Sequence, residues 1–374
     1  MLTDQKITTT MKLRTTTILF FASILTYAQQ ISKTEESFVD SVMNSYFKSN
    51  GPGAVILIAK NNIPVLKKSY GLANIELNVK NKPEYVFNIG SMSKQFTALC
   101  ILKLVQDGKV SLQDDIKKHL TDYNSHGHKI TIENILNHTS GIKNYSDKDD
   151  FFPKSVTDIS KDDLRKYFEN DSLFFEPNTN WSYCNSGYVL AGLIVEKVSG
   201  KSLAEFLTEN IFKPCGMENT FVGNDDSVFV NSVSGYDNVQ GLENTFEAKY
   251  RPAQYMSWTY SYGAGGIIST LDDLLKYNNS LLSYKIIKKE LLDKAWAPYI
   301  LPNGNSTNYG LGWAVGNYQG LKFVAHGGGL NGFRSYGILF PNEQLYIAVL
   351  SNTSAKTPVT YATPIAFKIA GKPL

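Results

Sequence analysis

The chain has 374 residues, of which 43% are hydrophobic and 19% charged, a composition typical of globular enzymes that excludes a disordered or fibrous protein. Its length allows one large domain or two closely packed ones. The formal net charge of +3 gives no electrostatic reason to expect a nucleic-acid partner.

The first 28 residues have the features of a secretory signal peptide. Lys12 and Arg14 precede an apolar run over 18–25, and small residues stand at the −3 and −1 positions before Gln29. We expect cleavage near Ala28 and a secreted or periplasmic mature chain over 29–374. No stretch reaches the roughly 20 apolar residues that a membrane-spanning helix requires, so no transmembrane span is expected.

The next hundred residues predict a helix, a hairpin and a second helix. Phe38, Val42 and Tyr46 fall on one face of an amphipathic helix over 34–48, which a glycine-proline segment ends. Two β-rich runs joined by a short polar turn predict an antiparallel hairpin, and a third apolar run leads into a helix. The ranges are 54–59 and 63–70 for the hairpin, 86–90 for the third run and 95–106 for the helix.

The middle of the chain is helical and its end returns to strands. Helical periodicity is found over 132–136, 161–168, 188–198 and 203–211, and strand patterns over 311–315, 321–325, 333–339 and 345–351. A sheet built from both ends of the chain, with helices inserted between them, is an α+β arrangement of two lobes. We place the sheet-containing lobe at about 29–110 and 255–374, and the helical lobe at about 111–254.

Ser91 is the candidate nucleophile. A Ser-x-x-Lys at the start of a helix places hydroxyl and ammonium one turn apart on one face, where the lysine can accept the serine proton. The spacing occurs three times, but Ser45 lies within a helix and Ser140 in a turn. Only Ser91, with Lys94, follows an apolar run and a glycine and begins a helix.

Tyr183 and Asn185 are the second pair of candidates. Tyr-x-Asn also occurs three times, and only this copy stands between a loop and the start of a predicted helix. A phenol beside a lysine ammonium is expected to lose its proton more easily than usual, so Tyr183 would serve as a general base. Asn185 would hold the lysine and a substrate amide.

A histidine and three glycines directly follow the predicted strand 321–325. We expect His326 to handle protons and contact substrate, while Gly328 and Gly329 let a substrate lie along the strand edge. The N–H groups of Gly329 and Ser91 would form an oxyanion hole.

These segments, in this order, resemble class C-type β-lactamase-related serine hydrolases, a group that includes penicillin-binding proteins and esterases. The matching segments are 87–97, 136–141, 183–185, 200–202, 214–217 and the His326 segment. The resemblance implies a β-lactamase/transpeptidase-like fold, an antiparallel sheet flanked by helices with an inserted helical lobe. It also implies an acyl-enzyme on Ser91, formed from an amide or ester and released by water without metal or other cofactor.

Three positions depart from the family pattern. His326 replaces the usual lysine of β-lactamases, and the loss of a permanent cation disfavours efficient β-lactam hydrolysis. Cys184 and Asn178 replace a small residue and a glycine, which is expected to reshape the cleft. An esterase or D-amino-acid peptidase is therefore favoured over a β-lactamase, with a small-molecule, peptide or ester substrate that could derive from peptidoglycan.

Other interpretations of the sequence have less support. The Gly-x-Ser-x-Gly of α/β-hydrolases is absent around Ser91. His126 and His128 lack a third metal ligand, and His138 is expected to stabilise the turn around Ser140. A catalytically degenerate peptidoglycan- or peptide-binding protein of the same fold stays open as the alternative. So does one disulfide among Cys100, Cys184 and Cys215, because three cysteines match no zinc pattern and cannot all pair.

Overall fold

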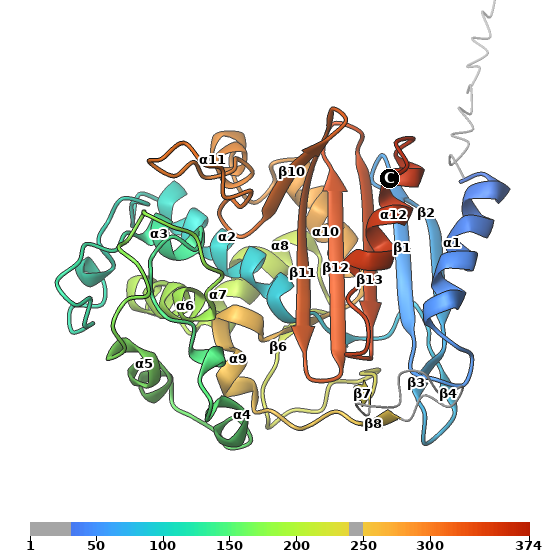
Figure 1. Ribbon diagram of the computed structural model, residues 1–374, viewed down its shortest axis with the longest axis horizontal. Coiled ribbons are helices and arrows are strands. Elements are labelled where there is room, and N and C mark those ends of the chain that lie inside the picture. Colours follow the sequence, from blue (N-terminus) through green and yellow to red (C-terminus); the bar gives the residue numbers. More distant parts are fainter. Residues whose placement is uncertain (1–30, 239–249) are drawn as a thin grey trace, which may run out of the picture.

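A six-stranded antiparallel sheet forms the centre of the molecule. The computed structural model describes residues 31–238 and 250–374, so the expected signal peptide lies outside the described residues. The strand order is β10-β11-β12-β13-β1-β2 (Figure 1). Both chain ends contribute strands, namely β1 (Ala54–Lys60), β2 (Ile63–Tyr70), β10 (Ala314–Tyr318), β11 (Leu321–Leu330), β12 (Phe333–Phe340) and β13 (Leu345–Ser351). The expected α+β fold is confirmed.

Helices cover both faces of this sheet, because its inner strands are apolar on both sides. Every residue of β13 is buried, and so is every residue of β1 except Lys60. On one face lie α1 (Lys33–Tyr46) and α12 (Val359–Ile369) (Figure 1). On the other face, α10 (Leu271–Leu282) contacts β1 and β13. A sheet covered in this way buries the two hydrophobic layers that hold the chain ends together.

The first helix is present, and its expected apolar face is only partly the buried one. Ser32 caps α1 by accepting the Glu35 N–H, while the Glu35 carboxylate accepts the Ser32 N–H. Phe38 and Val42 of that face pack against the core while partly buried. Val39 and Met43 are completely buried, whereas Tyr46 is exposed. Both sets of residues recur at helical spacing, so periodicity alone did not fix the rotation of the helix about its axis.

A helical region lies beside the sheet, on the left in Figure 1. Its central helix, α6 (Asn185–Ser199), contacts α2 (Ser93–Gln106) and α9 (Trp258–Gly265). Gly200 ends α6 at a φ of 70°, as expected of a C-cap glycine. The other helices of the region are α3 (Ile132–Leu136), α4 (Phe151–Lys154), α5 (Lys161–Glu169), α7 (Leu203–Leu207) and α8 (Lys213–Cys215), with a π-helical turn over Thr208–Phe212.

The carboxyl-terminal half contains more helix than the sequence indicated. The sequence predicted none of the four helices found there, which are α9, α10, α11 (Lys289–Ala295) and α12. The strand expected over 311–315 begins only at Ala314, because Gly312 adopts a φ of 98°. The strand expected to end at 325 instead continues to Leu330, so His326 and the glycines belong to β11. The remaining short strands are β3 (Leu72–Asn74), β4 (Val79–Lys80), β5 (Phe87–Asn88), β6 (Phe221–Val222), β7 (Tyr236–Asn238), β8 (Tyr250–Pro252) and β9 (Ile267–Ser269).

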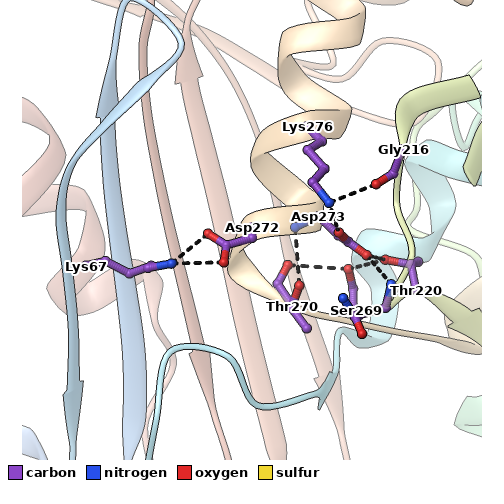
Figure 2. A network of polar contacts seen from close by, with 9 residues as sticks. Lys67, Gly216, Thr220, Ser269, Thr270, Asp272, Asp273 and Lys276 are labelled. Carbon is purple, nitrogen blue, oxygen red and sulfur yellow. Dashed lines mark hydrogen bonds and ion pairs between the residues drawn. The ribbon is translucent and has the colours of Figure 1, made fainter.

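A buried carboxylate ties the end of the helical region to the sheet-side helix α10 (Figure 2). Asp273 is fully buried and accepts hydrogen bonds from the Asn219 N–H at 2.6 Å and the Thr220 hydroxyl at 3.0 Å. Lys276 bridges it to the Gly216 carbonyl, and Thr270 caps the helix. The charge is therefore compensated, as a buried carboxylate requires.

No helix within residues 31–238 and 250–374 has the length and apolar character needed to cross a membrane. The three cysteines all lie in this part of the chain, and each is a free, buried thiol. The disulfide that the sequence left open is therefore not formed.

Candidate active site

Ser91 lies in a short 3₁₀ turn, Gly90–Met92, between β5 and α2. Gly90 adopts a φ of 50°, and a Cβ there would come within 2.7 Å of the Gly329 nitrogen, so glycine is required. The first hydrogen bond of the turn is donated by Met92 N–H. The Ser91 N–H precedes it and has no partner within the turn. It is therefore available beside Gly329, where the expected oxyanion hole would form.

Lys94 is completely buried one helical turn after Ser91. Its Nζ lies 3.0 Å from Ser91 Oγ, 2.6 Å from Asn185 Oδ1 and 2.9 Å from the Ala264 carbonyl oxygen. Burial lowers the pKa of Lys94 from 10.5 to about 7. A large fraction of Lys94 is thus neutral near pH 7, and a neutral amine can accept the Ser91 proton.

Tyr183 lies beside this pair, and its ring centroid is 4.7 Å from Lys94 Nζ. Burial raises the pKa of the phenol well above its ordinary value, and a hydrogen bond with Ser91 opposes this only in part. The expected depression of the Tyr183 pKa by Lys94 is therefore wrong. A lysine that has itself lost much of its charge through burial cannot stabilise a phenolate. The phenol keeps its proton and is suited to donate it.

Asn185 is the first residue of α6 and connects the helical region to the nucleophile. Its Oδ1 accepts from Lys94, and its Nδ2 donates to Ser146 Oγ at 2.9 Å. Its backbone N–H donates to Asn144 Oδ1 at 3.0 Å. These bonds fix the orientation of the Asn185 amide, so the lysine faces an acceptor and not the NH₂ group.

His326 is buried on β11 and held at both ring nitrogens. Nδ1 lies 2.5 Å from the Gly327 carbonyl oxygen, which can only accept, so Nδ1 carries the proton. Nε2 then accepts from the Tyr309 hydroxyl at 2.9 Å. Burial and the neighbouring Lys94 lower the pKa of His326 to about 3. The imidazole is neutral across the physiological range, which argues against the expected proton-handling role and leaves a part in lining the cleft.

The glycines after His326 allow β11 to lie against the nucleophile turn. A Cβ on Gly328 would come within 1.9 Å of the Ile89 carbonyl oxygen and 2.3 Å of Ser335 Oγ. β10 pairs with β11 only as far as Ala325. The strand edge over 326–330 is therefore not covered by β10 and faces the Ser91 turn, as expected for a strand on which substrate lies.

Ser91 opens into two cavities that share Gly329 and Arg334. The first, about 370 Å³, is mainly apolar and is called the aromatic cavity after Tyr145, Phe151, Phe152 and Tyr260; it also contains Met256, Asn185 and Asp237. The second, about 600 Å³, lies on the His326 side and contains Trp181, Tyr183, Tyr309, the first residue of α12, Val359, and the two residues before it, Thr357 and Pro358. A substrate bond placed at Ser91 would have one group in each cavity.

The Ser-x-x-Lys copy that begins at Ser45 does not form a pair like that of Ser91 and Lys94. Ser45 Oγ donates to the Val42 carbonyl oxygen and Lys48 to the Asn44 carbonyl oxygen, so the two side chains do not hydrogen-bond to each other.

The histidines considered as metal ligands have other partners. His126 contacts the Glu169 carbonyl oxygen, and His128 contacts the Glu176 carboxylate. In the described part of the chain, no group of three or more His, Cys, Asp or Glu side chains is placed to hold a metal ion.

The two departures around Tyr183 lie outside the linings of the two cavities that open from Ser91. Cys184 is buried, with Sγ 3.2 Å from the Ile142 carbonyl oxygen. Asn178 adopts a φ of 71°, which asparagine tolerates better than most residues. His138 accepts the Cys184 N–H at Nδ1, and its ring packs at a tilt against Tyr183 with the ring centroids 4.5 Å apart. Its side chain therefore supports Tyr183 and not, as expected, the Ser140 turn.

Three contributors were not identified from the sequence. The Ala264 carbonyl has no sequence signal, because it is a backbone atom placed by the kink at Tyr262, whose φ is 27°. Tyr309 stands in a glycine-rich segment, Tyr-Gly-Leu-Gly-Trp, which could have drawn attention to it. Arg334 follows the glycines by only five residues, and the hairpin between β11 and β12 brings it back to face Gly329.

Comparison with known proteins places these features in context. Residues 31–370 match the Beta-lactamase family. Protein flp of Staphylococcus aureus is 29% identical over 87% of this chain, and penicillin-binding protein 4* of Bacillus subtilis is 30% identical over 81%. The aligned regions span 65% and 68% of those proteins, respectively.

Solved structures show the same fold. An octameric penicillin-binding protein homologue from Pyrococcus abyssi superposes with a TM-score of 0.77, at 28% identity over 91% of this chain and 77% of that one. A D-amino acid amidase from Ochrobactrum anthropi, solved with D-phenylalanine, gives a TM-score of 0.77 at 20% identity, over 90% and 99% of the two chains. The second likeness concerns the fold alone.

Proposed function

Since this chain belongs to the Beta-lactamase family of serine hydrolases, we propose that it hydrolyses an amide or ester through an acyl-enzyme on Ser91. The observation that carries the proposal is the contact of Ser91 Oγ with a buried lysine whose pKa is lowered to about 7. A serine hydroxyl is a weak nucleophile unless a base stands within hydrogen-bond reach.

In the first step Ser91 Oγ attacks the carbonyl carbon while its proton passes to neutral Lys94. The N–H groups of Ser91 and Gly329 donate to the oxyanion that forms. Tyr183 protonates the leaving nitrogen or oxygen and regains a proton from Lys94, and the bond to the leaving group breaks. Water then attacks the acyl-enzyme, the lysine–tyrosine pair takes up its proton, and Ser91 is released with its proton restored.

The substrate we propose is an ester or a D-amino-acid peptide or amide, which could derive from peptidoglycan. Support comes from a neutral His326, which supplies no cation of the kind that β-lactam recognition uses. The aromatic cavity beside Asn185 fits an apolar acyl group. We also propose that the chain is exported, with its signal peptide cleaved near Ala28, which amino-terminal sequencing of the mature protein would test.

The rival is a catalytically degenerate binding protein of the same fold. A protein that only binds its ligand needs no desolvated lysine beside a serine, and burying Lys94 costs folding free energy. The assembled Ser91, Lys94 and Tyr183 therefore favour catalysis.

The deciding experiment exposes the protein to a fluorophosphonate and measures intact mass and the modified peptide. We expect one adduct on Ser91, absent in Ser91→Ala, and hydrolysis of a simple ester by the wild type only. Ser45→Ala is the matched control, since Ser45 begins a Ser-x-x-Lys whose side chains are not joined. A folded wild type without an adduct would support the binding protein.

A further inference from the structure

Tyr262 is a strained residue close to the nucleophile. It lies inside α9 with a φ of 27° and a ψ of −128°, outside the small left-handed region that residues with a side chain can adopt. A backbone held in such a conformation persists only where the surrounding contacts impose it, and residues of this kind cluster at functional sites. The reaction steps given above use no atom of Tyr262, so its strain requires a separate explanation.

The kink at Tyr262 directs two successive carbonyl groups of α9 towards α2. Thr97 Oγ1 donates to the Gly263 carbonyl oxygen at 2.7 Å, and Lys94 Nζ donates to the Ala264 carbonyl oxygen at 2.9 Å. In a regular helix the carbonyl groups point along the helix axis and not towards a neighbouring helix. The kink therefore gives Lys94 a backbone acceptor that a straight helix would not provide.

The Ala264 carbonyl determines which way neutral Lys94 faces. A neutral amine has two N–H groups and one lone pair, and the oxygens of Ser91, Asn185 and Ala264 all lie at 3.0 Å or less from Lys94 Nζ. The Asn185 and Ala264 oxygens can only accept, so they take the two N–H groups. The lone pair then points at Ser91 Oγ, the direction from which it can accept the serine proton.

The side chain of Tyr262 is held by the helical region. Gly192 of α6 leaves room for the ring, because a Cβ on Gly192 would come within 2.7 Å of Tyr262 Cε1. Lys161 Nζ lies 5.6 Å from the ring centroid, close enough for a cation–π contact, and Lys161 is itself paired with Glu196 of α6. These contacts fix the ring, and the strained backbone is fixed with it.

We propose that Tyr262 is a positioning residue, whose ring, held against Gly192, keeps α9 kinked and thereby aims the Ala264 carbonyl at Lys94. The proposal rests on the hydrolase function given above and adds a residue that acts on the base from outside the cleft, since Tyr262 lines neither cavity that opens from Ser91. A carbonyl that accepts from an ammonium group favours the charged form. Loss of this contact should therefore slow proton transfer and also lower the pKa of Lys94.

The pH dependence of Ser91 reactivity reports Lys94 and not its neighbours. Burial raises the pKa of the nearby phenols and thiol, and burial together with Lys94 lowers the pKa of the two nearby imidazoles. These five side chains, all neutral near pH 7, are Tyr183, Tyr188, Cys184, His138 and His326.

The rate at which a fluorophosphonate labels Ser91, measured across pH, tests the assignment without a substrate. Tyr262→Gly permits a positive φ but removes the ring that imposes it, so the backbone can relax. We expect the limiting labelling rate at high pH to fall about 10- to 100-fold, the range for a lost hydrogen bond to a charged group. The midpoint of the rise with pH should move to lower pH. Tyr262→Phe keeps the ring and should stay within about threefold of the wild type.

Gly192→Ala tests the same link from α6. Its methyl group meets the Tyr262 ring, while alanine favours the helix itself, so the fold should be retained. The labelling rate should fall and the midpoint should move to lower pH. Neither effect should appear when Gly192→Ala is added to Tyr262→Gly, because no ring is then left to displace.

The matched control is Tyr284→Gly, which removes an exposed tyrosine that also has a positive φ, 53°, and lines neither cavity. It should leave both the labelling rate and the midpoint unchanged. A wild-type midpoint in Tyr262→Gly would overturn the proposal even if the rate falls, because a merely structural loss lowers the rate alike at every pH. So would an equal effect of Gly192→Ala with and without the Tyr262 ring.

Folding of each variant is verified by circular dichroism. If Tyr262→Gly does not fold, Gly192→Ala decides, and an unmoved midpoint in that variant would reject the proposal. A folded wild type that is not labelled at any pH would instead overturn the hydrolase function itself. A labelled wild type with unmoved midpoints in the variants would reject only the role of Tyr262.

Discussion

Replacing Lys94 by methionine should change how stability depends on pH. Lys94 is completely buried, and its pKa falls from 10.5 to about 7 on folding. Between these values the unfolded chain binds more protons than the folded one, so the free energy of unfolding rises with pH. At 1.36 kcal/mol per pKa unit, the lysine costs the fold about 5 kcal/mol below pH 7. Between pH 6 and pH 9 about 3 kcal/mol of this cost disappears.

Methionine fills a similar volume without a charge, so Lys94→Met should lack this trend. We expect the stability of the wild type relative to the variant to rise by about 3 kcal/mol from pH 6 to pH 9, measured by urea unfolding followed by circular dichroism. The matched control is Lys109→Met, which removes an exposed lysine just beyond the same helix. The difference in unfolding free energy between the wild type and this control should not change with pH. The reasoning would be refuted if the difference in unfolding free energy between the wild type and Lys94→Met changed by less than about 1 kcal/mol over this pH range. Lys94 would then stay charged in the folded protein.

Three further outcomes are expected. The kcat/KM for a neutral ester should rise with pH through about 7, as Lys94 becomes neutral; a flat profile from pH 5 to 9 would exclude Lys94 as the base. Tyr183→Phe should lower the rate of amide hydrolysis about 100-fold or more, the range for a lost general acid. The rate for a nitrophenyl ester should fall less, because its leaving group needs no proton. Amide hydrolysis at the wild-type rate in Tyr183→Phe would remove Tyr183 from the mechanism. Asp273→Ala should lower the free energy of unfolding by about 3 kcal/mol through the buried donors it leaves unpaired, whereas a loss below about 1 kcal/mol in urea titration would mean that water replaces the carboxylate.

Local pattern was enough to identify much of the molecule. The hairpin of β1 and β2, the helix after Ser91 and the end of α6 at Gly200 follow from residue periodicity, glycine placement and polar turns, which act over a few neighbouring residues. The proximity of Ser91 and Lys94 is likewise local, because three residues in a helix make one turn. The sequence therefore determined the nucleophile candidate and the fold class on its own.

What only the tertiary structure decided depends on burial and on distant segments meeting. The inner face of α1 was set by packing against β2 and α12, and α9 to α12 lacked a local pattern strong enough to reveal them. The pKa shifts of Lys94, Tyr183 and His326 arise from loss of water, which the sequence cannot count. The Ala264 carbonyl and the Arg334 guanidinium reach the cleft only through a kinked helix and a strand pairing, and so the charge of the cleft is a property of the fold and not of any motif.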